Sequence, residues 1–295
     1  MKLKILFVIL LTACFALTGA RTFAQHVTFE VVATFDYPGA TATLPLGIND
    51  SGTVAGWFIP GIGEQSGFLR TVDGRFSPPL NEPQDYQLST VLTGINNAGT
   101  TVGWFATEGL TISGLILSDR IYSEFNVPGA TSTYIWSIND AGNFCGASDD
   151  PSAGRSAFVD IDGTLASFTV PGATFGTNGA GINNLNQCVG YYDGGAGFQG
   201  FLRQADGTLT YPIPANGHNT HLTGLNDSGW MVGDATNPTG WHGVFFPTLS
   251  NFVTYDYPGA IQTFFTSINN QGFICGYYNT SSSSGNGFLI RVHVK

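Results

Sequence analysis

The stretch Gly94-Ile95-Asn96-Asn97-Ala98-Gly99, followed by the apolar run Thr101-Val102-Gly103-Trp104-Phe105, decides the fold of this 295-residue chain. Related Ile-Asn or Leu-Asn turns occur five more times, at 47–52, 137–142, 181–186, 224–229 and 267–272. The first residues of consecutive copies are 43 to 47 positions apart. A fixed period of this length indicates one supersecondary unit copied along the chain, each too small to bury its apolar face alone. We number these units repeats 1 to 6 in chain order.

Each repeat carries four strand signals in a constant order. One apolar run leads into the turn, a second follows it, a Gly-Phe-Leu-like third comes next (Gly200-Phe201-Leu202), and a fourth opens after an Asp-Gly turn (Asp206-Gly207). Asn, Asp and Gly tolerate the left-handed backbone that tight hairpins need. The chain after the leader shows no helical periodicity. Four antiparallel strands in each of six units predict an all-β, six-bladed β-propeller of four-stranded blades.

The two ends of the repeat region complement each other. Residues 27–40 read as a fourth-type strand with no unit before it, and residues 287–295 read as a third-type strand with no fourth strand after it. We therefore expect the N-terminal strand to complete the last blade and close the ring, which removes two open sheet edges. Small residues precede the turn Ile or Leu in every repeat, and they suit innermost strands crowded around an axis: Gly47, Gly94, Ser137, Gly181, Gly224 and Ser267.

The N-terminus reads as an export signal. Lys2 and Lys4 precede an apolar run, and Thr22-Phe23-Ala24 places small residues where signal peptidase reads them. We expect a signal peptide over 1–24 and a single propeller domain over 25–295. The segment Leu11-Thr12-Ala13-Cys14 resembles a bacterial lipobox, so a lipoprotein anchored through Cys14 is the alternative. Both readings predict a secreted, periplasmic or cell-surface protein of a bacterium, without a transmembrane helix.

Charge limits the classes of partner. The chain has 10 Lys and Arg against 20 Asp and Glu, a formal net charge of −10. Loss of 1–24 removes Lys2, Lys4 and Arg21 and no acidic residue, which leaves 7 basic residues and a net charge of −13. Such a surface repels phosphate backbones, so nucleic acid is excluded as a partner.

Three cysteines follow the leader: Cys145, Cys188 and Cys275. Cys145 and Cys275 occupy the same position of repeats 3 and 6, which a closed ring would place too far apart for a disulfide. Cys188 comes one position earlier in its repeat and so points to the opposite face of its strand. All three are expected to be buried thiols that fill valine-sized sites.

The repeat resembles the secreted bacterial family known as the HAF extracellular repeat. The resemblance rests on the Ile-Asn-Asn-x-Gly turn, the Val-Gly-Tyr strand (Val189-Gly190-Tyr191) and the Gly-Phe-Leu strand, and it covers residues 27–295. The tripeptide that names the family is degraded in this chain, for example to Ser66-Gly67-Phe68. The resemblance implies an exported repeat protein, and it brings no catalytic activity or ligand.

Residues repeated in every copy are poor catalytic candidates, because in one active site each catalytic role is carried out by a single residue. The recurring Asn residues are expected to cap hairpin turns through their side chains: Asn49, Asn96, Asn139, Asn183, Asn226 and Asn269. Function is expected where the symmetry breaks, and repeat 5 gathers His218, His221 and His242. The three fall on one patch, and two of them have a spacing compatible with a shared divalent metal. The alternative is that polar loops simply tolerate histidine; no other cofactor is expected.

Aromatic residues just beyond the second strand form the other candidate site. They are Trp57, Trp104, Tyr191 and Tyr277, with Trp241 beside the histidines. Strand alternation sends one residue of each aromatic pair into the core between blades. The other could stack on the apolar face of a sugar ring. Packing between blades is the competing interpretation.

Signals for catalysis are weak. No carboxylate pair has a defined separation, and no nucleophile elbow, phosphate loop or zinc-protease helix is present. The sequence therefore predicts a monomeric, exported propeller that acts as a non-catalytic binding or structural module for extracellular carbohydrate or protein. The alternative is a propeller hydrolase or lyase that acts on extracellular polysaccharide.

Overall fold

The computed structural model describes residues 26–61, 65–86, 89–109, 111–215 and 219–295. The predicted signal peptide, Cys14 and His218 lie outside these residues. Within them the chain is all-β, with 23 strands and no helix. No helix in this part of the chain is therefore long and apolar enough to cross a membrane.

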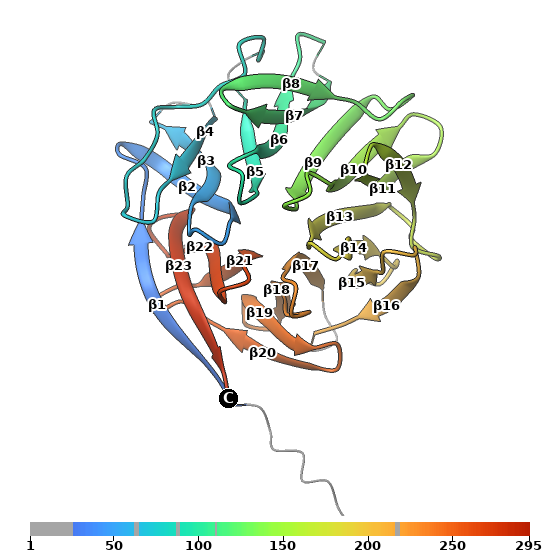
Figure 1. Ribbon diagram of the computed structural model, residues 1–295. Helices are drawn as coiled ribbons and strands as arrows, with labels where there is room; N and C mark the ends of the chain where they lie inside the picture. The colour runs from blue at the N-terminus through green and yellow to red at the C-terminus, as the bar shows by residue number, and fades with distance from the viewer. Residues whose placement is uncertain (1–25, 62–64, 87–88, 110, 216–218) are drawn as a thin grey trace, which may run out of the picture.

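The antiparallel sheets are arranged as a β-propeller (Figure 1). One sheet has the order β2 (Ala40–Ile48), β3 (Val54–Pro60), β4 (Ser66–Arg70). Repeats 2 and 3 share an eight-stranded sheet made of β5 (Val91–Ile95), β6 (Thr101–Ala106), β7 (Ile112–Ser118), β8 (Ile121–Phe125), β9 (Ser132–Ile138), β10 (Phe144–Asp150), β11 (Gly154–Ile161) and β12 (Thr164–Phe168). Only the parallel pair Ile112–Ser132 joins β7 to β9 in that sheet.

Three four-stranded sheets follow. Repeat 4 contains β13 (Thr177–Ile182), β14 (Cys188–Asp193), β15 (Phe198–Arg203) and β16 (Leu209–Ile213). Repeat 5 contains β17 (Thr220–Leu225), β18 (Met231–Asn237), β19 (Gly240–Thr248) and β20 (Asn251–Tyr255). The last sheet has the order β1 (Val27–Phe35), β23 (Asn286–Val294), β22 (Phe273–Asn279), β21 (Gln262–Ile268). β1 pairs antiparallel with β23, from Val27–Val294 to Phe35–Gly287, and so brings the two ends of the repeat region together (Figure 1).

Repeat 1 departs from the predicted four strands. In place of a fourth strand, β4 makes two isolated antiparallel bridges, Gly67–Leu80 and Arg70–Phe76, and the sheet has three strands. The segment between these bridges contains Pro78 and Pro79, which have no backbone N–H to donate to a ladder. The fourth strand of repeat 1 is therefore reduced to these contacts.

The innermost strands approach one another at the small residues, as predicted. A Cβ atom added to Gly47 would lie 2.7 Å from the Cα of Gly94, and one added to Gly181 would lie 2.8 Å from the Cα of Gly224. Real Cβ atoms do not come so close to a neighbouring backbone. Large side chains at these positions would force adjacent repeats apart.

Each innermost strand also carries a β-bulge. In β2 the pairing with β3 passes from Pro45–Gly56 to Gly47–Ala55 and leaves Leu46 unpaired. The other innermost strands skip the equivalent residues, which are Thr93, Trp136, Ala180, Thr223 and Thr266. We call these six the bulge residues. A bulge re-aims a side chain and bends its strand.

The six turn asparagines connect the repeats as well as capping their own turns. In its own turn Asn49 accepts a hydrogen bond at Oδ1 from the Thr53 backbone N–H, at 2.9 Å, as predicted. Its Nδ2 donates to the backbone carbonyl of Asn96 in the next repeat. The same bond occurs at every repeat with N···O distances of 2.9 to 3.2 Å, and Asn269 donates to the carbonyl of Asn49. Consecutive repeats, and the first with the last, are thus linked by the same buried polar bond.

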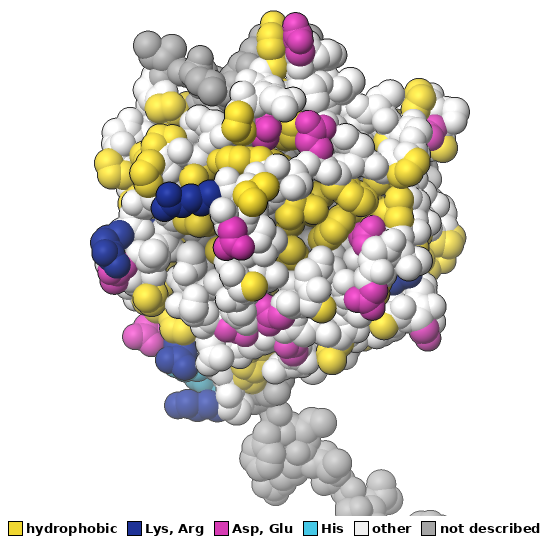
Figure 2. Space-filling model, turned by 45° about the horizontal axis from the view of Figure 1, so that its top comes forward, with side chains coloured by type: hydrophobic (Ala, Val, Ile, Leu, Met, Phe, Trp, Pro, Cys, Tyr) yellow, Lys and Arg dark blue, Asp and Glu magenta, His cyan; other side chains and the backbone are white. Residues whose placement is uncertain are grey.

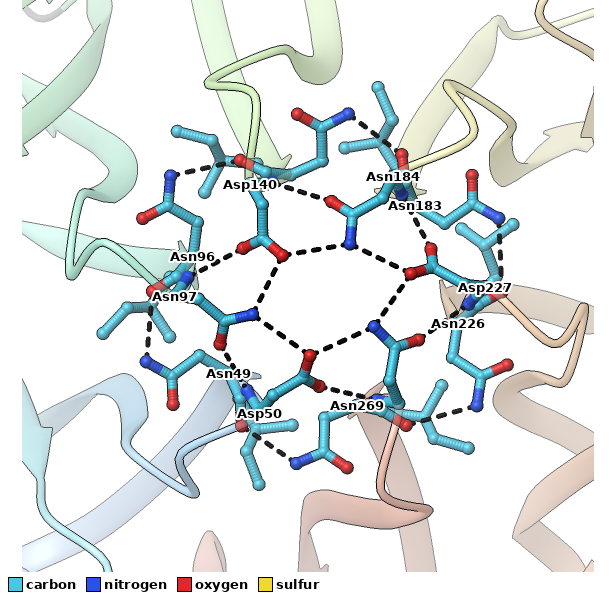
Figure 3. A pocket seen from close by; sticks show the side chains of 18 residues that line it. Asn49, Asp50, Asn96, Asn97, Asp140, Asn183, Asn184, Asn226, Asp227 and Asn269 are labelled. Carbon is cyan, nitrogen blue, oxygen red and sulfur yellow. Dashed lines mark hydrogen bonds between the residues drawn. The ribbon is translucent and has the colours of Figure 1, made fainter.

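A second ring is formed by the next residue of each turn, where Asp and Asn alternate: Asp50, Asn97, Asp140, Asn184, Asp227 and Asn270 (Figure 3). Each Asn amide donates to Oδ2 of both flanking aspartates, at 2.9 to 3.1 Å. Each backbone N–H donates to Oδ1 of the following member, at 2.8 to 2.9 Å. Both amide hydrogens of every Asn are therefore used. We call this the Asp/Asn ring; it surrounds a cavity of about 60 Å³.

The alternation in this ring predicts the effect of Asn97→Asp. The change removes two donated hydrogen bonds and places a new carboxylate between those of Asp50 and Asp140. We expect the free energy of unfolding to fall by about 1–3 kcal/mol at low salt, and by less at high salt, because the new repulsion is screened. Urea unfolding at two ionic strengths measures this. The control is Asn251→Asp, whose amide contacts only Thr248 Oγ1 in an outer hairpin; equal losses in the two variants would contradict the role of the ring.

Candidate binding site

The site lies at the end of the innermost strands opposite the Asp/Asn ring. Two residues before each bulge residue, the innermost strand pairs with the second strand at one equivalent position. We call these pairs the mouth pairs: Leu44–Trp57, Val91–Trp104, Tyr134–Ala147, Asn178–Tyr191, His221–Asp234 and Phe264–Tyr277. The innermost strands of the six repeats line a central channel. Because the six mouth pairs are equivalent positions, a difference in residue type between them identifies the repeat at which this end of the channel differs.

Repeat 5 departs furthest from the others. Its mouth pair is an imidazole and a carboxyl group, with Nδ1 of His221 3.0 Å from Oδ1 of Asp234. Burial raises the pKa of Asp234, and the hydrogen bond with His221 opposes that rise. Nε2 of His221 is buried and has no hydrogen-bond partner among the described residues. A buried polar atom without a hydrogen bond lowers the free energy of unfolding. The pair His221–Asp234 is therefore unfavourable for the stability of the fold.

Aromatic rings extend from this pair across repeats 4, 5 and 6. The ring centroids of His221 and Tyr191 are 4.4 Å apart. The His221 ring also stacks on Trp241, with centroids 5.1 Å apart and an interplanar angle of 24°. Trp241 lies 5.9 Å from Phe264, which stacks on Tyr277 at 4.7 Å and 19°. We call Tyr191, His221, Trp241, Phe264 and Tyr277 the aromatic row. All five side chains are only partly buried, so ring surface remains exposed.

A cavity lies next to the aromatic row inside the channel. It has a volume of about 100 Å³ and is lined by the six bulge residues and Tyr191. The threonine hydroxyls are already engaged with backbone carbonyls; Thr223 Oγ1, for example, donates to Phe265 O of the next repeat at 2.8 Å. The cavity therefore offers mainly apolar surface, with polar groups at its edge.

Charges near this end of the channel are paired internally. Arg155 donates to both carboxylate oxygens of Asp149, at 2.7 and 2.8 Å, and its guanidinium lies 4.9 Å from the centre of the Tyr134 ring. The pKa values of Tyr191 and Tyr277 are raised, first by burial and then by the nearby Asp234. Both phenols therefore stay neutral at physiological pH and serve as hydrogen-bonding groups.

The structure brings three of the five predicted aromatics together. Tyr191, Trp241 and Tyr277 belong to the aromatic row. Trp57 and Trp104 occupy the equivalent position in repeats 1 and 2, and Trp104 packs against Tyr134 with ring centroids 5.7 Å apart. The neighbours of these residues, such as Phe58 and Phe105, are buried in the core as alternation predicts.

The histidines of repeat 5 have separate partners. Trp241 stacks on His221, and the next residue of β19, His242, faces the other side of the strand. There His242 Nδ1 lies 2.5 Å from Asp256 Oδ1, and its Nε2 lies 2.8 Å from Asn237 Oδ1. Among the described residues no group of three or more His, Cys, Asp and Glu side chains is placed to hold a metal ion. His218, the third predicted ligand, is outside those residues.

Sequence reasoning missed the contribution of the innermost strands. Phe264 and Asn178 are mouth-pair residues, and Trp136 is a bulge residue, yet none belongs to a recurring motif. Their positions follow from the register between first and second strands. Alignment of the six repeats over the eight residues before each turn would have exposed the unusual Phe264.

No protein-family model matches the chain, and no curated protein sequence matches it significantly. Solved propeller structures are similar to it. A luciferin-regenerating enzyme has a TM-score of 0.54 and 14% identity, covering 92% of this chain and 97% of that one. The gluconolactonase XC5397 from Xanthomonas campestris has a TM-score of 0.54 and 10% identity, covering 90% and 97%. The Aleuria aurantia lectin in complex with Fucα1-6GlcNAc has a TM-score of 0.52 and 10% identity, covering 87% and 96%. At these identities the likeness concerns the fold alone.

Proposed function

We propose that this chain is an exported, monomeric, six-bladed β-propeller closed by β1, and that its aromatic row binds a neutral extracellular saccharide without turning it over. Support for the ring comes from the six repeats, the pairing of β1 with β23, and the bonds that lead from Asn49 through every repeat and from Asn269 back to Asn49. Support for export comes from the leader-like segment 1–24.

The observation that carries the binding proposal is the aromatic row itself. Flat rings from three consecutive repeats, with the carboxyl group of Asp234 and the phenols of Tyr191 and Tyr277 beside them, combine a stacking surface with hydrogen-bonding groups. Sugar rings need both, because their C–H faces are apolar and their edges carry hydroxyls. The mouth pairs of repeats 1 to 3 offer fewer polar groups, which supports a site in repeats 4 to 6.

Charge favours a neutral saccharide over an acidic one. The part of the chain after residue 24 carries a net charge of −13, and the arginine nearest the site is already paired with Asp149. Figure 2 shows Asp and Glu side chains spread over the visible face, with hydrophobic side chains between them. Such a field opposes the approach of polyuronates or sulfated glycans.

The test is retention of the purified chain on an array of neutral and acidic glycans. We expect retention on neutral glycans, and we expect Trp241→Ala to weaken it more than tenfold, as loss of a central aromatic anchor costs about 2 kcal/mol or more. The control is Leu185→Ala, an exposed apolar residue in the turn at the Asp/Asn ring end. Absence of retention on any glycan, or retention on acidic glycans alone, would refute the proposal.

One observation favours the hydrolase or lyase alternative. A histidine with Nδ1 on a carboxyl group and Nε2 without a partner has the arrangement of an oriented general base. The same array separates the two functions when the eluate is analysed. Released sugar or unsaturated product from a retained glycan indicates catalysis, and its absence indicates binding.

A further inference from the structure

Consecutive repeats make one recurring contact near the channel. One residue of each second strand pairs with the small Gly or Ser of its own repeat. In the next repeat, one residue of the second strand pairs with the turn Ile or Leu. These two residues lie in the same buried cluster. Val102 is clustered in this way with Phe144, Val189 with Met231, Val232 with Ile274, and Cys275 with Val54. Between repeats 3 and 4 both members of this contact are cysteines, Cys145 and Cys188.

Several independent contacts bring these two thiols together. Both side chains are fully buried, and they share a small cluster with Val159 and Ile182. Cys145 is paired with Ser137, Cys188 is paired with Ile182, and the Ile182 N–H donates to Ser137 Oγ at 3.3 Å. A Cβ added to Gly179 would lie 3.0 Å from the carbonyl oxygen of Gly146 and 3.3 Å from Sγ of Cys188. Burial, followed by the neighbouring thiol of Cys188, raises the pKa of Cys145.

All three cysteines are buried free thiols in the structure, as the sequence predicts, but the structure adds a neighbour that the comparison of repeats missed. Cys188 does point to the opposite face of its strand, but opposite faces of adjacent repeats meet. The comparison of Cys145 with Cys275 alone therefore missed the neighbour that matters. Among the described residues Cys275 has no cysteine in its buried cluster. Its Sγ lies 3.4 Å from Thr266 Oγ1, and burial raises its pKa to about 12.

We propose that Cys145 and Cys188 form a disulfide that links repeats 3 and 4 when the chain folds in an oxidising compartment. Each thiol loses its proton and one electron, an S–S bond forms, and the electron pair reduces the disulfide of a thiol–disulfide oxidoreductase or of oxidised glutathione to two thiols. Exchange takes place before repeats 3 and 4 have packed together, because both sulfurs are inaccessible afterwards. The bond would restrain the unfolded chain and stabilise the contact between the two repeats.

The experiment uses the full chain exported to a bacterial periplasm. The protein is unfolded in denaturant with one alkylating agent, then reduced and treated with a second agent of different mass, and the tagged peptides are mapped by mass spectrometry. We expect the first tag on Cys275 and the second on Cys145 and Cys188, with a linked peptide before reduction. The first tag on all three cysteines, or a disulfide that includes Cys275, would overturn the proposal.

Matched variants keep the result interpretable. Cys145→Val installs the residue found at this position in repeats 2, 4 and 5, so the variant is expected to fold with Cys188 as a free thiol. Reductant should lower the melting temperature of the exported wild-type chain by several degrees and leave that of Cys145→Val unchanged. Cys275→Val should retain the full response to reductant. Equal responses of the wild type and Cys145→Val would count against the disulfide.

Discussion

Replacing Gly103 by alanine should destabilise the chain strongly. Gly103 lies on β6, and a Cβ added to it would be 1.9 Å from the carbonyl oxygen of Val91. Val91 lies two residues before the bulge at Thr93 in β5, and a bulge bends its strand. The same clash, at 1.8 to 2.3 Å, occurs at the equivalent glycines of the other repeats: Gly56, Gly146, Gly190, Gly233 and Gly276.

An obstacle made of backbone cannot move aside without breaking strand pairing. We therefore expect Gly103→Ala to lower the free energy of unfolding by about 3 kcal/mol or more. Urea unfolding followed by circular dichroism measures the loss. Gly109→Ala is the matched control, since its Cβ would meet only Thr107 Oγ1, at 3.9 Å; its effect should stay within about 0.5 kcal/mol. Equal unfolding midpoints for the two variants would show that the bulge does not constrain Gly103.

Exchanging the mouth pair of repeat 5 for that of repeat 6 should separate function from stability. The double variant His221→Phe/Asp234→Tyr installs the pair Phe264–Tyr277, which stacks in repeat 6 at the same register. It removes a buried carboxyl group whose raised pKa shows the cost of its desolvation. Replacing a buried polar pair by packed apolar groups is commonly neutral or stabilising. We expect the double variant to unfold at or above the wild-type midpoint.

The single variant His221→Phe should behave differently. It leaves Asp234 buried without its partner, which costs about 3–5 kcal/mol when the charge is retained. The two substitutions are therefore non-additive, and the double variant should recover what the single variant loses. Thermal and urea unfolding of wild type, single and double variants check this; an additive result would mean that the pair is not coupled in the folded chain.

Much of the fold can be predicted from the sequence because the same pattern of strands and turns recurs in six repeats. The repeat period, the hairpin residues and the small residues before each turn predict the strand order and the close approach of innermost strands. Pro78 and Pro79, in contrast, remove a strand from repeat 1 locally. A repeat-average pattern cannot predict a change that occurs in one copy.

The candidate site could be predicted only in part. Tyr191, Trp241 and Tyr277 were identified because they interrupt or follow a motif. Phe264 and the bulge residues were not, because a bulge leaves no signature in residue type and shifts the register by one residue. The turn asparagines illustrate the same limit: their capping role is local and was predicted, whereas Nδ2 reaches a carbonyl 43 to 47 residues away along the chain in the next repeat.

The most direct test of the account is the affinity of wild type and of His221→Phe/Asp234→Tyr for a neutral glycan that the wild-type chain retains. Isothermal titration calorimetry gives both dissociation constants, and circular dichroism verifies that both chains are folded. We predict that the double variant keeps its fold and binds more than tenfold more weakly. Equal affinities in two folded proteins would contradict the assignment of the site to the break in repeat symmetry at His221 and Asp234.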